Sequence, residues 1–427
     1  MELASYWHAT APRFVPATRE GPGRYDVVVI GAGFTGLSAA RHLAKAGKKV
    51  AVLEARQVGH GASCRNGGHL NNGMAHGYGD AMARFGDDGA RRLYHAFDDS
   101  IDLIEAVIEE EAIACDFRRS GKLKIASKPG HVAGLKASCA LIKEQADKDV
   151  VFLDHSDLAG SIVTADAYAG MLYPKSAMMH MGRYMHGLAV AVERHGGAIF
   201  EQTPVTAIKK SGTAWTLNTP LGAFSAQDVI AATGAYSGQI RKTPLQEFAS
   251  RIIPVGSFVV VTRPLTDAEV SASVPGGHTY VTSLNVGNYF RLSPDNRMIF
   301  GGRARFSSKS DANSDAKSAE ILQRDLGRMF PILKGVEIEY CFGGLVDMTQ
   351  DRLPRAGQLN GMYYAMGYSG HGAQISNLMG VVLADMIMGR AENPLAGMSW
   401  PKMPFYSGRP WFLPVVGAYF RAKDLIS

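Results

Sequence analysis

Short runs of β-branched residues near the N-terminus flank a segment with helical spacing of its apolar residues. The run Val27–Ile30 is followed by a glycine-rich turn, and apolar residues then recur every three or four positions until a second run, Val50–Leu53. A short apolar run is typical of a buried strand, whereas the three- and four-residue spacing is typical of a helix that buries one face. Residues 25–54 are therefore predicted to fold as strand, turn, helix and strand.

The turn after the first strand has the spacing of a dinucleotide-binding motif. It reads Gly31-Ala-Gly33-Phe-Thr-Gly36, and Glu54 follows the second strand. In such a motif Gly31 allows the tight turn, Gly33 lets a pyrophosphate approach the backbone, and Gly36 lets helix and strand pack closely. The pyrophosphate would meet the helix N-terminus, and Glu54 would accept hydrogen bonds from ribose hydroxyls. A lone glycine signature is weak evidence, but its context here favours a dinucleotide.

A second glycine-rich segment follows almost directly after Glu54. Residues 59–73 contain five glycines, and glycine destabilises both helix and strand interiors, so a loop is predicted. The backbone amides of such a loop can close on a flat ligand, with Ser63, Arg65 and Asn66 donating to phosphate or ring oxygens. An ordinary exposed loop is the alternative.

The remaining pattern is mainly helical at first and becomes strand-like after Pro254. Gly and Pro turns separate the later alternating segments, so a mixed or antiparallel sheet is expected there. Residues 1–24 are expected to form a surface arm, and residues 307–317 a polar linker. Helices are predicted over 89–111, 131–145, 181–195, 318–330 and 373–388, and strands over 123–126, 198–201, 214–217, 222–226, 228–233, 256–262, 288–292, 298–302, 338–342 and 362–366.

Length and charge narrow the class of protein. A chain of 427 residues exceeds what one core usually supports, so two domains are expected. With 46% hydrophobic and 20% charged residues, the composition excludes global disorder. The net charge of +6 comes with scattered basic pairs that lack interleaved aromatic residues, which favours a solvated surface over a nucleic-acid site.

Cysteine usage and the absence of targeting patterns favour a cytoplasmic protein. Cys64, Cys115, Cys139 and Cys341 form no Cys-x-x-Cys pair, so neither a disulfide framework nor a metal site is indicated. The N-terminus has no basic and apolar leader, and no run of about eighteen uncharged apolar residues occurs. We expect a soluble, cytoplasmic protein without a transmembrane segment or a bound metal.

One dinucleotide motif without a second favours a single tightly bound flavin over a flavin combined with a nicotinamide coenzyme. The glycine turns at Gly234 and at 367–372 are the further elements that a flavin needs, because its ring extends well beyond the first strand–helix–strand unit. The helix beginning near Ala373 would point its N-terminus at the N1/C2 carbonyl edge and stabilise the reduced ring, by up to about 2 kcal/mol. A plain helix-cap turn is the alternative.

Motifs along nearly the whole chain carry a specific family resemblance. They are GAGFTGLSAA, LEARQVGHGASCRNGGHL, FPILKGVEIEY and GYSGHG, together with Ser5-Tyr-Trp7, Asp295-Asn-Arg297 and Phe300-Gly-Gly302. The chain resembles the D-amino acid oxidase and sarcosine oxidase superfamily, and within it most resembles the γ-glutamylputrescine oxidase branch. The resemblance implies an α/β protein (α+β overall), with a Rossmann-like FAD-binding domain and a second domain built on a mixed or antiparallel β-sheet.

The expected domains follow from this resemblance. The FAD-binding domain is expected to be discontinuous, over residues 25–75, 151–245 and 335–400. The substrate domain is expected over residues 76–150 and 246–334, with an N-terminal arm over 1–24 and a C-terminal tail over 401–427.

The family chemistry is oxidation of a carbon–nitrogen bond. Hydride passes from the carbon beside a neutral amine to flavin N5, and water converts the imine to an aldehyde. O2 or another electron acceptor would reoxidise the flavin, with O2 giving H2O2. The expected substrate is a small-molecule amine of the γ-glutamylated polyamine type, such as γ-glutamylputrescine.

Other functions stay open. A pipecolate or N-methyl amino acid oxidase or dehydrogenase of the same fold is the nearest alternative, and a non-catalytic flavin-binding protein is a remote one. Gly367-Tyr-Ser369-Gly-His371 also resembles a hydrolase nucleophile elbow, but it lacks the second glycine and any triad partner. The sequence leaves oligomeric state open.

Departures from the family pattern bear on cofactor attachment and substrate. Sarcosine-oxidase-like members attach flavin to a cysteine whose matching position here is Gly344, so FAD is expected to be non-covalent, although Cys341 lies nearby. Their carboxylate-binding lysine and arginine correspond here to Gln374 and Asn71. Exchanging a cation for an amide forfeits roughly 1.5–3 kcal/mol, which favours amines whose carboxylate lies far from the reacting nitrogen.

The resemblance also supplies the candidate site residues. The substrate-side candidates are His69, Tyr289, Arg303, His371 and Gln374, and for each a structural role is equally open. The residues expected to contact FAD are Gly31, Gly33, Phe34, Thr35, Gly36, Glu54, Ala55, Arg56, Gly61, Ala62, Ser63, Asn66, Gly67, Gly68, Val205, Gly234, Gly344, Gly370, His371, Gly372 and Ala373.

Overall fold

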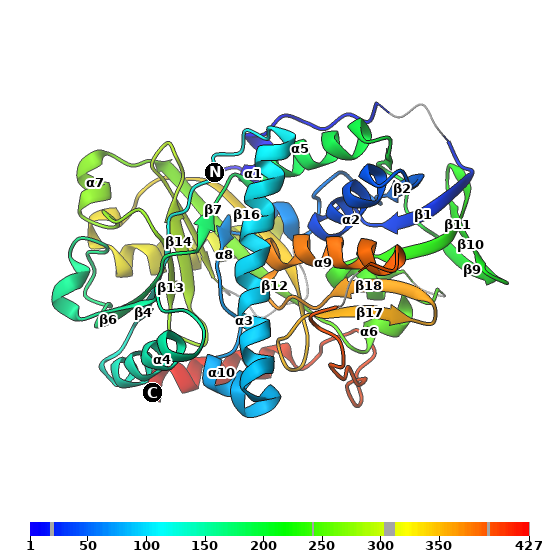
Figure 1. The fold of residues 1–427 in the computed structure, drawn as a ribbon. Coiled ribbons are helices and arrows are strands. Elements are labelled where there is room, and N and C mark those ends of the chain that lie inside the picture. Colours follow the sequence, from blue (N-terminus) through cyan, green and yellow to red (C-terminus); the bar gives the residue numbers. More distant parts are fainter. Residues whose placement is uncertain (18–20, 241–242, 303–311, 391–392, 427) are drawn as a thin grey trace.

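The computed structural model describes residues 1–17, 21–240, 243–302, 312–390 and 393–426, and its main feature is a pair of β-sheets (Figure 1). The first sheet has the strand order β17-β18-β11-β1-β2-β8, with the β9–β10 hairpin attached to β11. β1 pairs in parallel with both β2 and β11, as expected for a dinucleotide-binding fold. The bounds are β1 Arg24–Ile30, β2 Val50–Leu53, β8 Ala198–Phe200, β9 Ala207–Ser211, β10 Ala214–Thr219, β11 Gly222–Ala231, β17 Arg355–Leu359 and β18 Met362–Met366.

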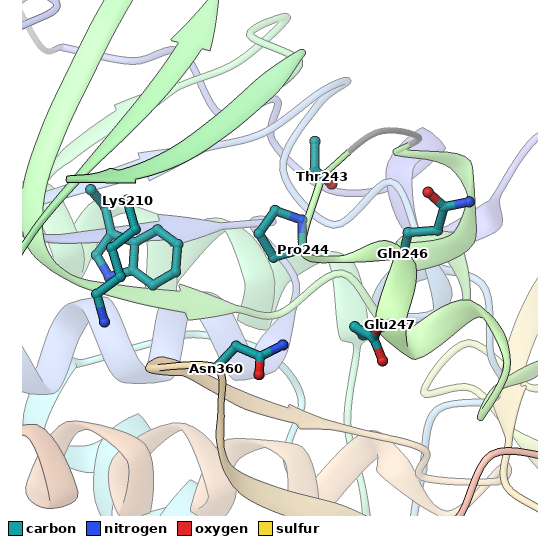
Figure 2. A pocket seen from close by; sticks show the side chains of 7 residues that line it. Lys210, Thr243, Pro244, Gln246, Glu247 and Asn360 are labelled. Atoms are coloured by element: carbon teal, nitrogen blue, oxygen red, sulfur yellow. The ribbon is translucent and has the colours of Figure 1, made fainter.

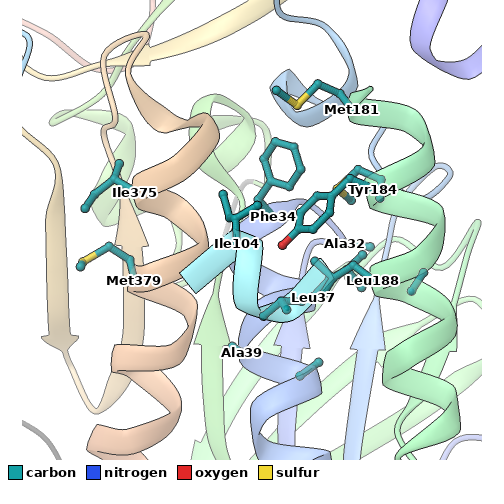
Figure 3. Packing of buried hydrophobic residues seen from close by; sticks show 14 of the residues in the cluster. Ala32, Phe34, Leu37, Ala39, Ile104, Met181, Tyr184, Leu188, Ile375 and Met379 are labelled. Carbon is teal, nitrogen blue, oxygen red and sulfur yellow. The ribbon is translucent and has the colours of Figure 1, made fainter. Parts of the chain in front are cut away.

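Helices cover one face of the first sheet. α2 (Phe34–Lys45) lies beside α5 (Met181–Arg194) and α9 (Gly372–Ile387), and α3 (Tyr78–Glu111) crosses them (Figure 1). Figure 3 shows Leu37 of α2 packed among side chains of the neighbouring helices, including Leu188 and Met379. The apolar residues that recur at helical spacing in the sequence therefore form the buried face of these helices.

The second sheet has the order β16-β12-β15-β14-β13-β4-β6-β5, and its neighbours are antiparallel except for the parallel pair β13–β4. One face packs on α8 (Ala312–Met329) through an apolar cluster that includes Phe258, Phe290 and Phe300. The bounds are β4 Lys122–Ala126, β5 Val151–Leu153, β6 Ala169–Tyr173, β12 Ile253–Pro264, β13 Thr279–Thr282, β14 Asn288–Leu292, β15 Arg297–Gly302 and β16 Ile338–Met348. The predicted combination of a Rossmann-like sheet and a mixed second sheet is confirmed.

Smaller elements complete the chain. β3 and β7 form a two-stranded pair beside the second sheet. In the described part of the chain no helix combines the length and the apolar character that crossing a membrane requires. The bounds are α1 Tyr6–Ala9, α4 Val132–Gln145, α6 Gln246–Ala249, α7 Asp267–Ser271, α10 Leu413–Ile426, β3 His69–Leu70, β7 Ala177–Met178, and the 3-10 helices η1 Ala62–Cys64, η2 Pro129–His131, η3 His155–Leu158, η4 Gly234–Gln239 and η5 Pro331–Leu333.

Several sequence expectations about the elements need correction. The predicted helix over 89–111 begins at Tyr78, because the helix continues across a kink at Gly86, whose φ is 69°. The separate strands predicted over 222–226 and 228–233 are one strand, β11. The polar linker over 307–317 lies outside the described residues up to 311, and from Ala312 onward it is already helix α8.

The strand pairing joins segments that the sequence assigned to different domains. β5, β6 and β16 were assigned by sequence to the FAD-binding segments, but all three pair within the second sheet. β6 also pairs with β4, and β16 pairs with β12; these partners lie far away in the sequence, which is why local patterns do not reveal them. The division into two functional domains stays a prediction.

The N-terminal segment is not a surface arm over its whole length. Trp7 of α1 is 1% exposed, and its Nε1 donates to the carbonyl of Asn66 at 2.7 Å. Phe14 is also buried. The Pro and Gly content that suggested an arm does not exclude this anchoring, because a few aromatic side chains are enough to bury the segment.

A pair of glycine substitutions tests how tightly α2 and α9 pack. A Cβ at Gly380 of α9 would lie 2.5 Å from the carbonyl oxygen of Thr35, so Gly380→Ala should destabilise the protein by about 1–3 kcal/mol. Gly134 lies within α4 with open space around it, so Gly134→Ala should instead be neutral or stabilising by up to about 1 kcal/mol. Urea unfolding of both variants measures the contrast, and equal effects would contradict the close approach of the two helices.

Candidate active site

The glycine turn has the geometry that the motif requires. Gly31 has a φ of 104°, and a Cβ there would lie 2.7 Å from the carbonyl oxygen of Ala232. A Cβ at Gly36 would overlap the carbonyl oxygen of Gly31. The turn and the helix therefore fit against the first strand only because side chains are missing at these positions.

The N-terminus of α2 is open to a phosphate. Gly33 precedes the helix and supplies no capping side chain, and the N–H of Phe34 donates to the hydroxyl oxygen of Ser63 at 3.1 Å. A Cβ at Gly33 would lie 3.0 Å from that oxygen. A phosphate oxygen could accept from the same N–H groups, and Ser63 is placed to donate to it.

Two of the expected FAD contacts do not face the turn with their side chains. The ring of Phe34 is buried in the helix layer beside Tyr184 (Figure 3), and the hydroxyl of Thr35 pairs with the hydroxyl of Tyr368 at 2.7 Å. Only backbone groups of these two residues are therefore placed to contact a cofactor. Val205 likewise contributes its side chain to the core beneath the first sheet.

Glu54 lies across the glycine turn. One carboxylate oxygen accepts from the N–H of Ala32 at 2.8 Å, and the other accepts from the N–H of Arg56 at 2.9 Å. Burial raises the pKa of Glu54 above its ordinary value, and the two backbone donors oppose this rise. Each oxygen keeps a further lone pair that a ribose hydroxyl could use, whereas Ala55 and Arg56 are exposed beside it.

The loop over residues 59–73 is held mainly by its own polar side chains. The amide of Asn66 donates to the carbonyls of Ala62 and Ser63, and its oxygen accepts from the N–H of Gly68. Arg65 donates to the carbonyls of His60 and Gly343. Arg65 and Asn66 therefore shape the loop, which leaves Ser63 and backbone N–H groups to contact a cofactor. Gly61 lies against the Tyr236 ring.

Arg291 of β14 supports this loop and was not found by sequence reasoning. Its guanidinium is buried and donates to the carbonyls of Gly67, Met179 and Leu292 at 2.8–3.1 Å. A Cβ at Gly68 would collide with it. Nothing in the residues around Arg291 in the sequence indicates that its side chain reaches this loop.

Asp347 of β16 was also missed, and it joins the two later glycine turns. Its carboxylate accepts from the N–H of Gly367 at 2.6 Å, and a Cβ at Gly234 would lie 3.6 Å from the same oxygen. Burial raises the pKa of Asp347 to about 6. The turn that it clamps has positive φ at Gly367 and Gly370, and it leads directly into α9.

The N-terminus of α9 is placed next to the first glycine motif. The Thr35–Tyr368 bond ties the turn before α9 to α2, and His371, which precedes the helix, provides no side-chain cap. Gly372 packs against Tyr368, and Ala373 packs against the helix layer. No side chain at His371 caps the first N–H groups of α9, so they could serve a ring carbonyl, as the sequence predicts.

Tyr289 and His69 are brought together on the substrate side. Their rings make an edge contact at 5.5 Å, and the ring of Tyr289 lies between Gly67 and Gly301. Burial is the main cause that lowers the pKa of His69 to about 3, and Arg291 adds to it. His69 is therefore a neutral ring at working pH and a weak base. Arg303, another substrate-side candidate, lies outside the described residues.

Gly344 lies opposite the loop and not beside a thiol. A Cβ at Gly344 would lie 2.7 Å from Cβ of Arg65, whereas Cys341 faces the other side of the sheet, in the cluster under α8. All four cysteines are free and buried. This arrangement supports the expectation that a flavin would not be attached covalently.

A cavity of about 470 Å³ lies at the β9–β10 hairpin, which contributes Lys210 and Trp215 to its lining (Figure 2). It is lined by Lys210, Trp215, Thr243, Pro244, Gln246, Glu247 and Asn360. None of the glycine turns contributes to it, so we do not assign the chemistry to this cavity.

The raised pKa of Asp347 gives a test of this buried clamp. Folding favours its protonated form, so the wild type should lose stability relative to a neutral variant as pH rises from about 4 to about 6. Asp347→Asn keeps an acceptor for the N–H of Gly367. The free energy of unfolding of the variant, relative to that of the wild type, should therefore increase by up to about 3 kcal/mol between pH 4 and pH 6. Thermal unfolding at both pH values measures it, and a constant difference would show that burial does not perturb Asp347.

Comparison with known proteins agrees with this geometry. The model of the family described as FAD dependent oxidoreductase matches residues 26–386. The chain is 34% identical to the probable oxidoreductase OrdL of Haemophilus influenzae, over 90% of this chain and 88% of that protein. It is 32% identical to the gamma-glutamylputrescine oxidoreductase of Escherichia coli, over 99% of this chain and 98% of that protein.

Solved structures agree on the fold. The crystal structure of glycine oxidase from Geobacillus kaustophilus superimposes with a TM-score of 0.76 at 21% identity, covering 89% of this chain and 99% of that one. The family match spans most of the chain and includes both of its sheets. The chain therefore belongs to the family of FAD-dependent oxidoreductases and is an FAD-dependent enzyme.

Proposed function

We propose that this enzyme oxidises amines whose carboxylate lies far from the reacting nitrogen, with γ-glutamylputrescine as the best candidate. The main observation behind the proposal is that Gln374 is buried and already hydrogen-bonded. It occupies the position where the family resemblance implies a carboxylate-binding lysine. Gln374 is 1% exposed, and its amide already donates to the carbonyl of Asn71.

The environment of Gln374 argues against simple α-amino acids as substrates. An amide lacks the charge that a lysine would offer to a carboxylate beside the reacting carbon. Asn71, the other expected anchor, is engaged as well, because its side-chain oxygen accepts from the hydroxyl of Thr279 at 2.9 Å. A carboxylate on a short substrate would therefore find no cation at these two positions.

The charges around the site favour a neutral amine, which is the form that gives up hydride. Arg291 is buried on this side of the second sheet and stays charged at neutral pH, because its pKa is lowered only to about 10, and a nearby cation lowers the pKa of an ammonium. His69 stays neutral and holds its place through the carbonyl of Phe290. Bound FAD would accept the hydride and pass the electrons to O2 or another acceptor.

The relatives support the amine class. The Escherichia coli gamma-glutamylputrescine oxidoreductase aligns with nearly the whole of both chains. Identity of 32% is compatible with a change of substrate, so the proposal depends on the binding groups of this chain.

Anaerobic reduction of the flavin tests the proposed substrate. γ-Glutamylputrescine should bleach the visible absorbance of the purified holoenzyme in a rapid, saturable reaction, whereas glycine and sarcosine should react at least about tenfold less efficiently, because a charge-assisted bond to the carboxylate is missing. Stopped-flow absorbance measures both rates. Bleaching by pipecolate or an N-methyl amino acid, with none by γ-glutamylputrescine, would show that the proposed substrate is wrong.

A second test concerns how FAD is held. Since Gly344 replaces the attachment cysteine and Cys341 faces away from the site, acid precipitation should release the yellow cofactor into the supernatant. Absorbance of the supernatant and mass spectrometry of the pelleted protein measure the partition. Flavin that remains in the pellet and adds to the mass of the protein would contradict non-covalent binding.

A further inference from the structure

The strand register places two lysines on the site-facing side of the second sheet. Lys122 and Lys124 of β4 pair with Thr279 and Val281 of β13, and Val281 pairs with Tyr289 of β14. Side chains alternate between the two faces of a strand, so Lys124 and Tyr289 share one face. The residues next to these on each strand, such as Leu123 on β4 and Phe290 on β14, point to the opposite face. They lie in the core under α8.

The row from Lys124 to Tyr289 is open where its surroundings are closed. Lys124, Val281 and Tyr289 are each partly exposed, although the neighbouring residues on these strands, Leu123, Tyr280 and Phe290, are fully buried. Adjacent strands lie about 4.8 Å apart, so the main chains of Lys124 and Tyr289 are separated by roughly 10 Å. This partly exposed strip is the path that an extended chain with one end beside Tyr289 would follow.

The two lysines differ in their surroundings: the carboxylate of Asp98 acts on Lys122, whereas burial is the one cause that shifts the pKa of Lys124. Among the described residues, no hydrogen bond or ion pair engages the ammonium group of Lys124. Lys122 donates to the carbonyl of Asn72 and lies 3.7 Å from the centre of the Tyr173 ring. Burial is the largest cause that lowers the pKa of both lysines.

The loop contacts connect this pair to the rest of the site. Asn72 accepts from Lys122, and the preceding Asn71 accepts from Thr279 and from Gln374 at the start of α9. The same loop segment therefore touches β4, β13 and the helix expected at the ring. Lys122 is engaged in positioning this segment, whereas Lys124 is the cation that remains available for a ligand.

We propose that Lys124 binds the distal α-carboxylate of a γ-glutamyl amine whose reacting nitrogen lies near Tyr289. The inference rests on the proposed function and names the group that recognises the far end of that substrate. It explains how an enzyme without the expected cation at Gln374 and Asn71 can still select an acidic substrate. Selectivity then depends on the separation between amine and carboxylate.

The test compares γ-glutamylputrescine with the same compound in which the α-carboxylate is a carboxamide. The wild type should prefer the carboxylate by about 10- to 150-fold in KM, as expected for one charge-assisted bond. In Lys124→Met this preference should disappear, with kcat changed far less than KM. Lys124→Arg should restore part of it. Equal KM values for the two compounds in the wild type would overturn the inference without any variant.

Lys143→Met is the matched control, because Lys143 of α4 is an exposed lysine of the same region. It should keep the full preference for the carboxylate. The flavin spectrum and the melting temperature verify that each variant is folded. A preference that persists in folded Lys124→Met would show that another group binds the carboxylate.

A binding measurement separates this inference from the proposed function. γ-Glutamylbutylamine carries the carboxylate but lacks the reacting amine, so calorimetry reports its dissociation constant in the holoenzyme without turnover. It should bind at least about tenfold more weakly to Lys124→Met than to the wild type. If γ-glutamylputrescine fails to reduce the flavin, the proposed function is wrong, and the calorimetric difference still decides whether Lys124 binds the carboxylate.

Discussion

A single buried guanidinium holds the parts of the site together. Arg291 belongs to the second sheet, yet it donates to Gly67 of the glycine-rich loop and to Met179, and it lies 5.3 Å from the ring of Trp7. Burial lowers its pKa only to about 10, so it stays charged at neutral pH. Carbonyl dipoles compensate a buried charge only when they are fixed, so the loop, the N-terminal helix and the sheet constrain one another.

The same constraint sets the electrostatic character of the site. Arg291, Lys122 and Lys124 all lie on the face of the second sheet that meets the loop, and carboxylates such as Glu54 and Asp347 are held by backbone N–H groups elsewhere. A positive surface disfavours an ammonium and favours a carboxylate. A molecule with an amine at one end and an acid at the other is suited to such a site only if its amine enters neutral.

The sequence was most informative where a function depends on neighbours in the chain. The glycine turn at Gly31, the acid Glu54 and the helix α9 were all located from local spacing, because turns and helices are closed by nearby residues. Asp347, Arg291 and Lys124 were missed because their roles come from pairing between distant strands, which leaves no periodic signal. The burial of Trp7 was missed for the same reason, since its partner Asn66 belongs to a separate segment.

If Lys124 binds the far carboxylate, strand pairing sets the length of substrate that the site accepts. The fold itself is shared with glycine oxidase. The loop and α9 lie at one end of the exposed strip, and β4 reaches its other end only because it pairs in parallel with β13. The strand spacing sets the distance between Tyr289 and Lys124, and a side chain on β4 cannot move independently of the sheet. Under the proposed function, a cation two strands away from the reacting carbon would favour a long substrate over a short amino acid, and the fold would not have to change.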